Sequence, residues 1–147
     1  MILNIILASL TIVILITASF QDFKTREVPD WISYGFLFSV LGLKSLFAIE
    51  FGWELLASSL LGLLIFFLLA LLFYHTNQWG GADSKLLMGM GALIGADFVF
   101  YQDSWELPSF FLLLLIVGAI YGLVWSLFVA VHKRKDFAGR LISGYIL

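Results

Sequence analysis

Long hydrophobic stretches dominate this sequence and set the first limit on its fold. Residues 2–20, 31–49, 53–74 and 108–131 are almost entirely apolar. A transmembrane helix needs roughly 20 such residues. Because lipid offers no hydrogen-bond partners for backbone N–H and C=O groups, an apolar run that enters a bilayer is expected to be helical. The sequence therefore predicts an all-α integral membrane protein.

Two further segments complete the predicted bundle. Residues 82–101 form a glycine-rich fourth span, and residues 137–147 are apolar except for Arg140. This last segment has 11 residues, which is short for a full crossing. We expect one transmembrane domain over residues 1–147. It is a compact bundle of six helices, or of five if the last segment lies at the interface, with no soluble domain.

The composition excludes several classes of function. Of the 147 residues, 62% are hydrophobic and 12% are charged, against about a quarter charged in soluble proteins. The net charge of −2 gives no reason to expect nucleic acid as a partner, whereas a lipid bilayer is expected. Without cysteine there is no disulfide framework and no thiolate nucleophile. His75 and His132 lie far apart in the sequence, so we expect neither a metal site nor another cofactor.

The charges between the spans predict the orientation. Lysine and arginine occur in residues 21–30, in residues 75–85 and directly after residue 131, which alternating crossings place on one side. The charged residues of the opposite connections are all acidic, namely Glu50, Glu54, Asp103 and Glu106. Since short basic loops stay in the cytoplasm, we expect the N-terminus outside. The first span lacks the basic start of a signal peptide, so we expect it to be retained.

Three features inside the spans have structural interpretations. Lys44 lies near the outer end of the second span, and we expect its ammonium group to reach outward to water. Asp97 follows Asp83 by 14 residues, or about 21 Å of helix, so we expect it near the outer surface. The pair Gly91 and Gly95 has the spacing of a close helix–helix contact.

Two carboxylates lie at the predicted cytoplasmic edge. Asp22 follows the first apolar run directly, and Asp83 begins the fourth. Two carboxylates held close together share a proton. One then activates water while the other protonates a peptide carbonyl oxygen, which is the chemistry of aspartic proteases and needs no metal. The alternative is that both are interfacial residues that fix helix ends.

The residues around Asp83 suit such a site. Gly80 and Gly81 allow the backbone to bend sharply and an extended substrate strand to approach closely. The N-terminus of the fourth span favours negative charge, and Lys85 adds positive charge nearby.

Two motifs carry a resemblance to a known family. Residues 22–29, DFKTREVP, resemble the D-x-K-x-R-x-[IV]-P signature of type IV prepilin peptidases and archaeal preflagellin peptidases, and residues 80–85, GGADSK, resemble their G-x-G-D-x-K signature. Members of this family are membrane-embedded aspartic peptidases that remove a short basic leader from prepilin-like or preflagellin precursors, and the resemblance implies the same activity for this chain. Their site lies at the cytoplasmic face of the prokaryotic cell membrane. It implies the following site residues: Asp22 and Asp83 as the catalytic pair, with Lys24, Arg26, Pro29, Gly80, Gly81 and Lys85 as the other motif residues.

The sequence departs from the family pattern in three places. Ala82 occupies the third position of G-x-G-D, and residues 137–145 resemble a degraded form of the closing segment. The large bacterial members carry a cytoplasmic domain with cysteine pairs and also methylate the new N-terminus. Because this sequence has no cysteine, we expect peptidase activity without methyl transfer.

Two other functions stay open. Asp22 and Asp83 would serve as an ion or proton relay in a small transporter subunit. A relay, however, needs ionisable groups distributed through the membrane depth, whereas these acids cluster at the faces. The second alternative is that the chain is a non-catalytic partner in a membrane assembly.

Overall fold

The structure is a computed structural model that describes residues 2–96 and 105–144, with side chains up to His132. Every regular element in these ranges is a helix. The helices are α1 (Ile2–Thr25), α2 (Asp30–Phe51), α3 (Glu54–His75), α4 (Gly81–Ile94) and α5 (Glu106–Gly144). By length and composition, α1, α2, α3 and the Glu106–His132 part of α5 suffice to cross a membrane. The predicted all-helical membrane class is confirmed.

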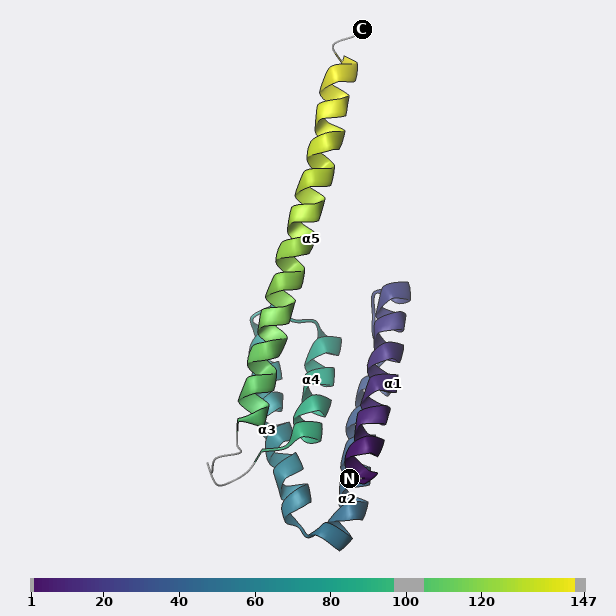
Figure 1. Ribbon diagram of the computed structural model, residues 1–147, viewed down its shortest axis with the longest axis vertical. Coiled ribbons are helices and arrows are strands. Elements are labelled where there is room, and N and C mark those ends of the chain that lie inside the picture. The colour runs from purple at the N-terminus through teal and green to yellow at the C-terminus, as the bar shows by residue number, and fades with distance from the viewer. Residues whose placement is uncertain (1, 97–104, 145–147) are drawn as a thin grey trace. The chain divides into compact units, whose positions relative to one another are not determined.

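The chain divides into two compact units, residues 1–107 and residues 108–147. In the first unit, α1 to α4 run alternately up and down (Figure 1). Helix α4 packs against α2 and α3, and α1 packs against α2. The candidate site residues all belong to this unit. The second unit is the remainder of α5.

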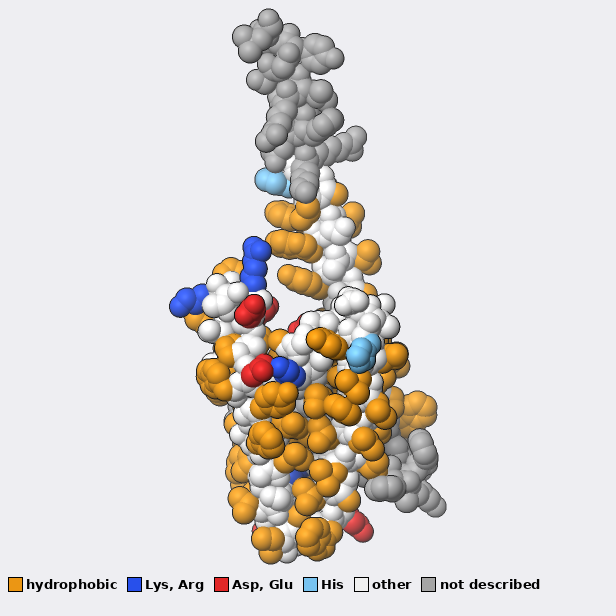
Figure 2. Space-filling model, turned by 180° about the vertical axis from the view of Figure 1, so that it is seen from behind, with side chains coloured by type: hydrophobic (Ala, Val, Ile, Leu, Met, Phe, Trp, Pro, Cys, Tyr) orange, Lys and Arg blue, Asp and Glu red, His pale blue; other side chains and the backbone are white. Residues whose placement is uncertain are grey.

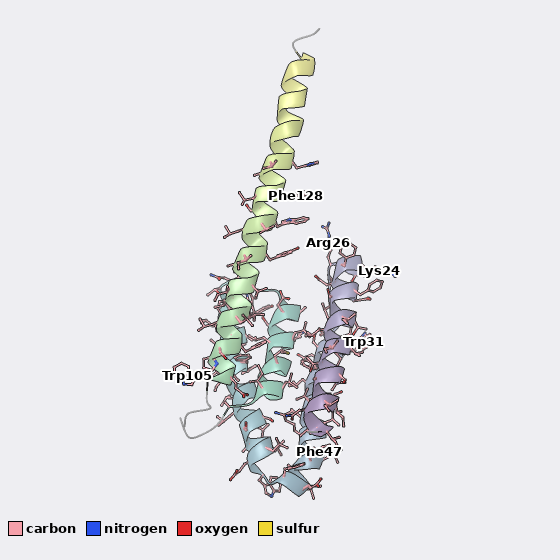
Figure 3. All side chains as sticks on the ribbon, viewed as in Figure 1. Lys24, Arg26, Trp31, Phe47, Trp105 and Phe128 are labelled. Atoms are coloured by element: carbon pink, nitrogen blue, oxygen red, sulfur yellow. The ribbon has the colours of Figure 1, made fainter. Side chains whose placement is uncertain are left out.

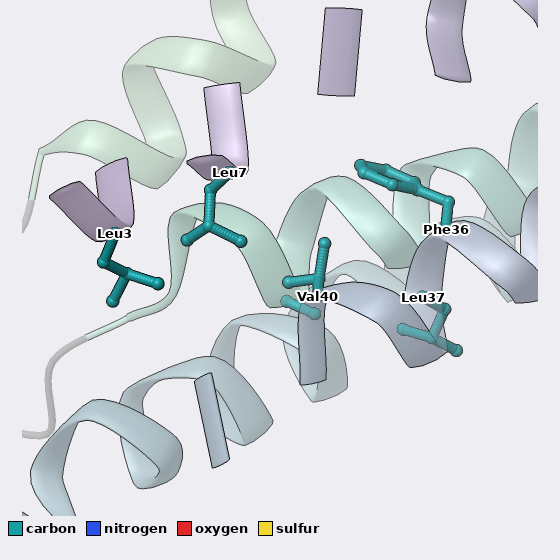
Figure 4. Packing of buried hydrophobic residues seen from close by; sticks show 6 residues of the cluster. Leu3, Leu7, Phe36, Leu37 and Val40 are labelled. Carbon is teal, nitrogen blue, oxygen red and sulfur yellow. The ribbon is translucent and has the colours of Figure 1, made fainter. Parts of the chain in front are cut away.

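A hydrophobic cluster joins three helices of the first unit (Figure 4). Its buried members are Leu3 and Leu7 from α1, Phe36, Leu37 and Val40 from α2, and Ala92 from α4. The side chains of Phe36 and Val40 are completely buried. This cluster fixes the relative positions of the helices that carry the two motif aspartates.

Helix α4 is shorter than the predicted span of residues 82–101. It has 14 residues, about 21 Å, against a hydrocarbon core of about 30 Å. The helix ends because Gly95 adopts φ +79° and ψ 174°, a conformation that glycine tolerates better than other residues and that cannot continue a helix. Asp97 lies outside the described residues, so its expected position is not tested.

Helix α5 corrects the predicted C-terminal region. We expected one span to end at residue 131 and a separate segment to begin at residue 137, but α5 is continuous over 39 residues. The intervening sequence, HKRKD, contains neither glycine nor proline, so its charges change the polarity of the helix without ending it. The described residues thus form five helices, and a distinct sixth is not among them.

Glycines bring α3 and α4 into close contact. A Cβ atom built on Gly62 would lie 2.7 Å from the Gly95 Cα and would also overlap the Gly91 carbonyl oxygen. The N–H of Ala96 donates to the Ser58 carbonyl oxygen at 2.9 Å. The contact predicted from Gly91 and Gly95 is confirmed, and its partner on α3 is Gly62.

Lys44 is placed differently from the prediction. It is only 5% exposed, and its ammonium group donates to the carbonyl oxygens of Ala92 at 3.1 Å and Leu93 at 2.7 Å. The expectation that Lys44 reaches outward is wrong. Because α4 ends beside α2, its last carbonyl groups lack intrahelical partners, and Lys44 supplies the missing donors.

Candidate functional site

The first motif forms the end of α1 and the turn into α2. Asp22 lies in the last turns of α1 and is exposed. Lys24 and Arg26 are exposed as well, and both point away from the bundle (Figure 3). Arg26 is the first residue after α1 and has φ +58°, while its N–H donates to the Asp22 carbonyl oxygen at 2.7 Å. Helix α1 thus ends within one turn of the motif aspartate.

Pro29 has an identifiable role in this turn. It precedes α2 directly with φ −59° and ψ 142°, and its carbonyl oxygen accepts from the Ile32 N–H at 3.0 Å. A proline here costs no helical hydrogen bond, because the first N–H groups of a helix have no intrahelical partner. The conformation of the first motif therefore follows from its own residues.

The second motif forms the start of α4. Gly80 precedes the helix, and Asp83 is the third helical residue. The Ser84 N–H and hydroxyl both donate to the Gly80 carbonyl oxygen, at 3.2 and 3.0 Å. The Asp83 carboxylate turns back over Gly80, with its Oδ2 atom 3.5 Å from the position of a Cβ built there. Asp83 is exposed.

The two glycines of this motif do not adopt conformations that require glycine. Gly80 has φ −72°, and Gly81 has no positive φ. A Cβ built on Gly81 would meet the Tyr74 ring at 3.7 Å, which is ordinary van der Waals contact. The backbone conformation at these two positions therefore does not by itself require glycine.

An ion pair connects the two motifs. The Lys85 ammonium group lies 2.5 Å from the Asp30 Oδ1 atom and 5.2 Å from the centre of the Tyr34 ring. Asp30 follows Pro29 directly and lies in the first turn of α2. This pair was not predicted from the sequence. A signal was present, since an acidic residue borders one motif and a lysine closes the other.

A groove lies beside the second motif in the first unit. It has a volume of about 250 Å³ and is lined by residues of α2, α3 and α4: Tyr34, Phe67, Ala70, Leu71, Tyr74, Gly81, Ser84, Lys85 and Met88. Its walls are mostly apolar, and Lys85 supplies a positive charge. Asp83 does not line this groove, so groove and carboxylate lie on different sides of α4.

Charged side chains gather at one end of the first unit, beyond a broad hydrophobic surface (Figure 2). The C-terminal end of α1, with Asp22, and the N-terminal end of α4, with Asp83, lie toward the same end of the bundle (Figure 1). Neither carboxylate has a hydrogen bond or an ion pair to another described residue. Within the described ranges, no group of three His, Asp or Glu side chains is arranged to hold a metal.

Both motifs lie in a region that matches one known protein family. Residues 9–127 match the model of the type IV leader peptidase family. The chain belongs to this family. The matched region includes both motifs, whereas residues 137–145 lie beyond it. As a leader peptidase family member with several apolar helices, the chain is a multi-pass membrane protein.

Two curated relatives are archaeal proteins. The chain is 32% identical over 149 aligned positions to a preflagellin peptidase of Methanococcus voltae, which covers 90% of this chain and 64% of the relative. It is 35% identical over 85 positions to a preflagellin peptidase of Methanococcus maripaludis, and this alignment covers 54% of this chain and 35% of the relative. The chain thus spans less than two thirds of each relative. No solved structure matches it.

Proposed function

We propose that this type IV leader peptidase family member is an aspartic endopeptidase that removes the leader from preflagellin or prepilin-like precursors. One observation carries the proposal. Its two motif aspartates, Asp22 and Asp83, are exposed at helix ends on the same end of one bundle. Preflagellin is the first substrate to test, because both relatives are named preflagellin peptidases. We expect no methyl transfer.

The depth of the two carboxylates supports a shared site. Asp22 precedes the turn at Arg26 by four residues, about 6 Å of helix. Asp83 precedes Lys85 by two residues, and Lys85 contacts Asp30 on the other side of the same turn. The turn between α1 and α2 is therefore a common reference level close to both aspartates.

The helix faces also support the pairing. Asp22 follows Ala18 by four residues, and side chains at this spacing share a helix face. Ala18 is 3% exposed, so this face turns inward one turn below Asp22. On α4, Leu86 and Met90 share a face with Asp83 and pack against the cluster that includes α1. Each aspartate thus lies on a helix face that turns into the bundle within the next turn or two of its helix.

The proposed mechanism needs only these two carboxylates and water. An ionised carboxylate removes a proton from water, which attacks the scissile carbonyl carbon, while the protonated carboxyl group donates to the carbonyl oxygen. Collapse of the tetrahedral intermediate breaks the C–N bond, and the new amine receives a proton. Because the carboxylates lie on separate helices, we propose that substrate binding completes their alignment.

The remaining motif residues have positioning roles in this proposal. Gly80 and Gly81 leave room for an extended substrate backbone beside Asp83. Lys85 holds the start of α4 against α2 through Asp30, and Pro29 fixes the start of α2. Lys24 and Arg26 are exposed at the end of α1 and act as cytoplasmic anchors.

We further propose that this end of the bundle faces the cytoplasm of a prokaryotic cell, with the N-terminus outside. The basic residues of the first motif and Lys85 lie at this end, whereas Glu50 and Glu54 lie at the opposite helix ends. This distribution follows the positive-inside rule. Cysteine labelling with an impermeant maleimide tests it, because the chain has no native cysteine. We expect the maleimide to react with Thr25→Cys only when it is added on the cytoplasmic side.

Reconstitution in liposomes tests the activity itself. The purified chain is incubated with preflagellin and S-adenosylmethionine, and the product N-terminus is identified by mass spectrometry. We expect removal of the leader at one peptide bond and an unmethylated product. A methylated product would contradict the absence of methyl transfer. Ion flux across the same liposomes without cleavage would favour the transporter alternative, and neither activity would favour an assembly partner.

A further inference from the structure

Lys44 is a buried cation that the proposed chemistry does not use. It lies on α2, 5% exposed, within the apolar part of a membrane-length helix. Its contacts are the carbonyl oxygens of Ala92 and Leu93 on α4. No described carboxylate forms an ion pair with it. A lysine in such a place is costly, so its retention calls for a specific role.

The contacts of Lys44 fall at the C-terminal end of α4, where the last carbonyl groups have no donor within the helix. The N–H of Gly95 satisfies the Gly91 carbonyl oxygen, and the next two carbonyl groups are the two that Lys44 binds. Positive charge at a helix C-terminus is also favourable to the helix dipole. On the α3 side, Ser58 accepts from the Ala96 N–H. The C-terminal end of α4 is therefore held from both neighbouring helices.

The contacts of Lys44 at the C-terminal end of α4 also affect the position of the N-terminal end of this helix. Asp83 lies in the first turn of α4, and Ala92 follows it by nine residues, about 14 Å along the axis. A helix of this length moves as one body. A change in its depth or rotation at Ala92 therefore displaces Asp83 by a similar amount.

We propose that Lys44 is a positioning residue for Asp83, which sets the depth and rotation of α4 by binding its terminal carbonyl groups. The inference rests on the proposed peptidase function for its catalytic consequence. Its structural part, the register between α2 and α4, is independent of that function. Lys44 touches no reacting atom and acts only through the helix.

The register is tested at the far end of the two helices. Asp30 and Lys85 are in contact, so Asp30→Cys and Lys85→Cys together report the register of α2 and α4 through a short thiol cross-linker. The chain has no other cysteine to interfere. Cross-linking is measured in liposomes with Lys44, with Lys44→Met, and with Ser59→Ala. Ser59 is a matched control, because it is buried but donates only within its own helix, to Leu55.

We expect Lys44→Met to lower the cross-linking yield several-fold, while Ser59→Ala leaves it unchanged. In the protein without added cysteines, Lys44→Met is expected to lower kcat by about tenfold to a hundredfold with little change in KM, because small misplacements of reacting groups have such effects. Unchanged cross-linking in Lys44→Met overturns the inference and leaves the proposed function intact.

Lys44→Arg covers the case in which the methionine variant does not accumulate. Arginine keeps the charge and the donors, so its cross-linking yield and kcat are expected to stay within about twofold of the wild type. Loss of cross-linking in a normally accumulating Lys44→Arg protein also overturns the inference. Failure of the proposed function has a different signature: no cleavage by the wild type while the cross-link still depends on Lys44.

Discussion

The contact between Gly62 on α3 and the glycines of α4 yields a quantitative prediction. A Cβ on Gly62 would lie 2.7 Å from the Gly95 Cα, whereas ordinary contact begins at 3.4 Å. The helices must therefore separate by at least 3.4 − 2.7 = 0.7 Å there. The obstructing atoms are backbone, so no side chain can turn away. Because packing drives helix association in membranes, we expect Gly62→Ala to lower the free energy of unfolding by about 1–3 kcal/mol.

Equilibrium unfolding in mixed detergent micelles, followed by circular dichroism, measures this loss. Gly42→Ala is the matched control, because Gly42 lies in α2 and a Cβ there meets nothing within 4 Å. The control is expected to be as stable as the wild type or up to about 1 kcal/mol more stable, since alanine is the better helix former. If Gly62→Ala unfolds within about 0.5 kcal/mol of Gly42→Ala, the close contact between α3 and α4 is wrong.

Three further experiments test other parts of the bundle. Ser33 is buried and its hydroxyl has no hydrogen-bond partner among the described residues. Ser33→Ala is therefore expected to leave the free energy of unfolding unchanged or raise it by about 1 kcal/mol, and a clear loss in the same unfolding assay would contradict this. The Asp30 side chain is 69% exposed, so a double-mutant cycle with Asp30→Asn and Lys85→Met is expected to give a coupling of less than about 1 kcal/mol, and a larger value would contradict the surface character of the pair. Gly81→Ala is expected to unfold like the wild type but to cleave preflagellin at least about tenfold more slowly, because the new methyl group fits the resting protein but obstructs the substrate backbone; full activity would remove the case for glycine there.

Hydrophobicity predicted most of the helices. The segments 31–49 and 53–74 correspond to Asp30–Phe51 and Glu54–His75 within two residues at each end. The first helix continues to Thr25, five residues beyond its apolar run, because residues 21–25, which are polar except for Phe23, are compatible with a helix. Apolar length is a direct consequence of membrane thickness, so it locates spans well and exact helix ends less well.

The errors share one physical cause. Hydropathy reports the polarity of side chains, whereas the end of α4 and the continuity of α5 depend on backbone conformation at Gly95 and on the absence of a helix-breaking residue in HKRKD. The burial of Lys44 depends on where another helix ends, which no local pattern contains. Asp22, Asp83, Gly80, Gly81 and Lys85 were predicted from their position at the cytoplasmic edge, and the resemblance added Lys24, Arg26 and Pro29. The ion pair between Lys85 and Asp30 required the tertiary structure.

The central claim is that Asp22 and Asp83 form the catalytic pair, and substitution by asparagine tests it most directly. Asparagine keeps the shape of each side chain but removes its acid–base function. Preflagellin cleavage is measured in liposomes for wild type, Asp22→Asn, Asp83→Asn and the control Glu27→Gln. Glu27 is an exposed acid in the turn between α1 and α2.

We expect both aspartate variants to accumulate normally and to lose at least about a thousandfold in kcat, a loss of the size that follows removal of a catalytic group, while Glu27→Gln cleaves like the wild type. Cleavage by either asparagine variant at the wild-type rate would show that its aspartate is not catalytic and only fixes a helix end.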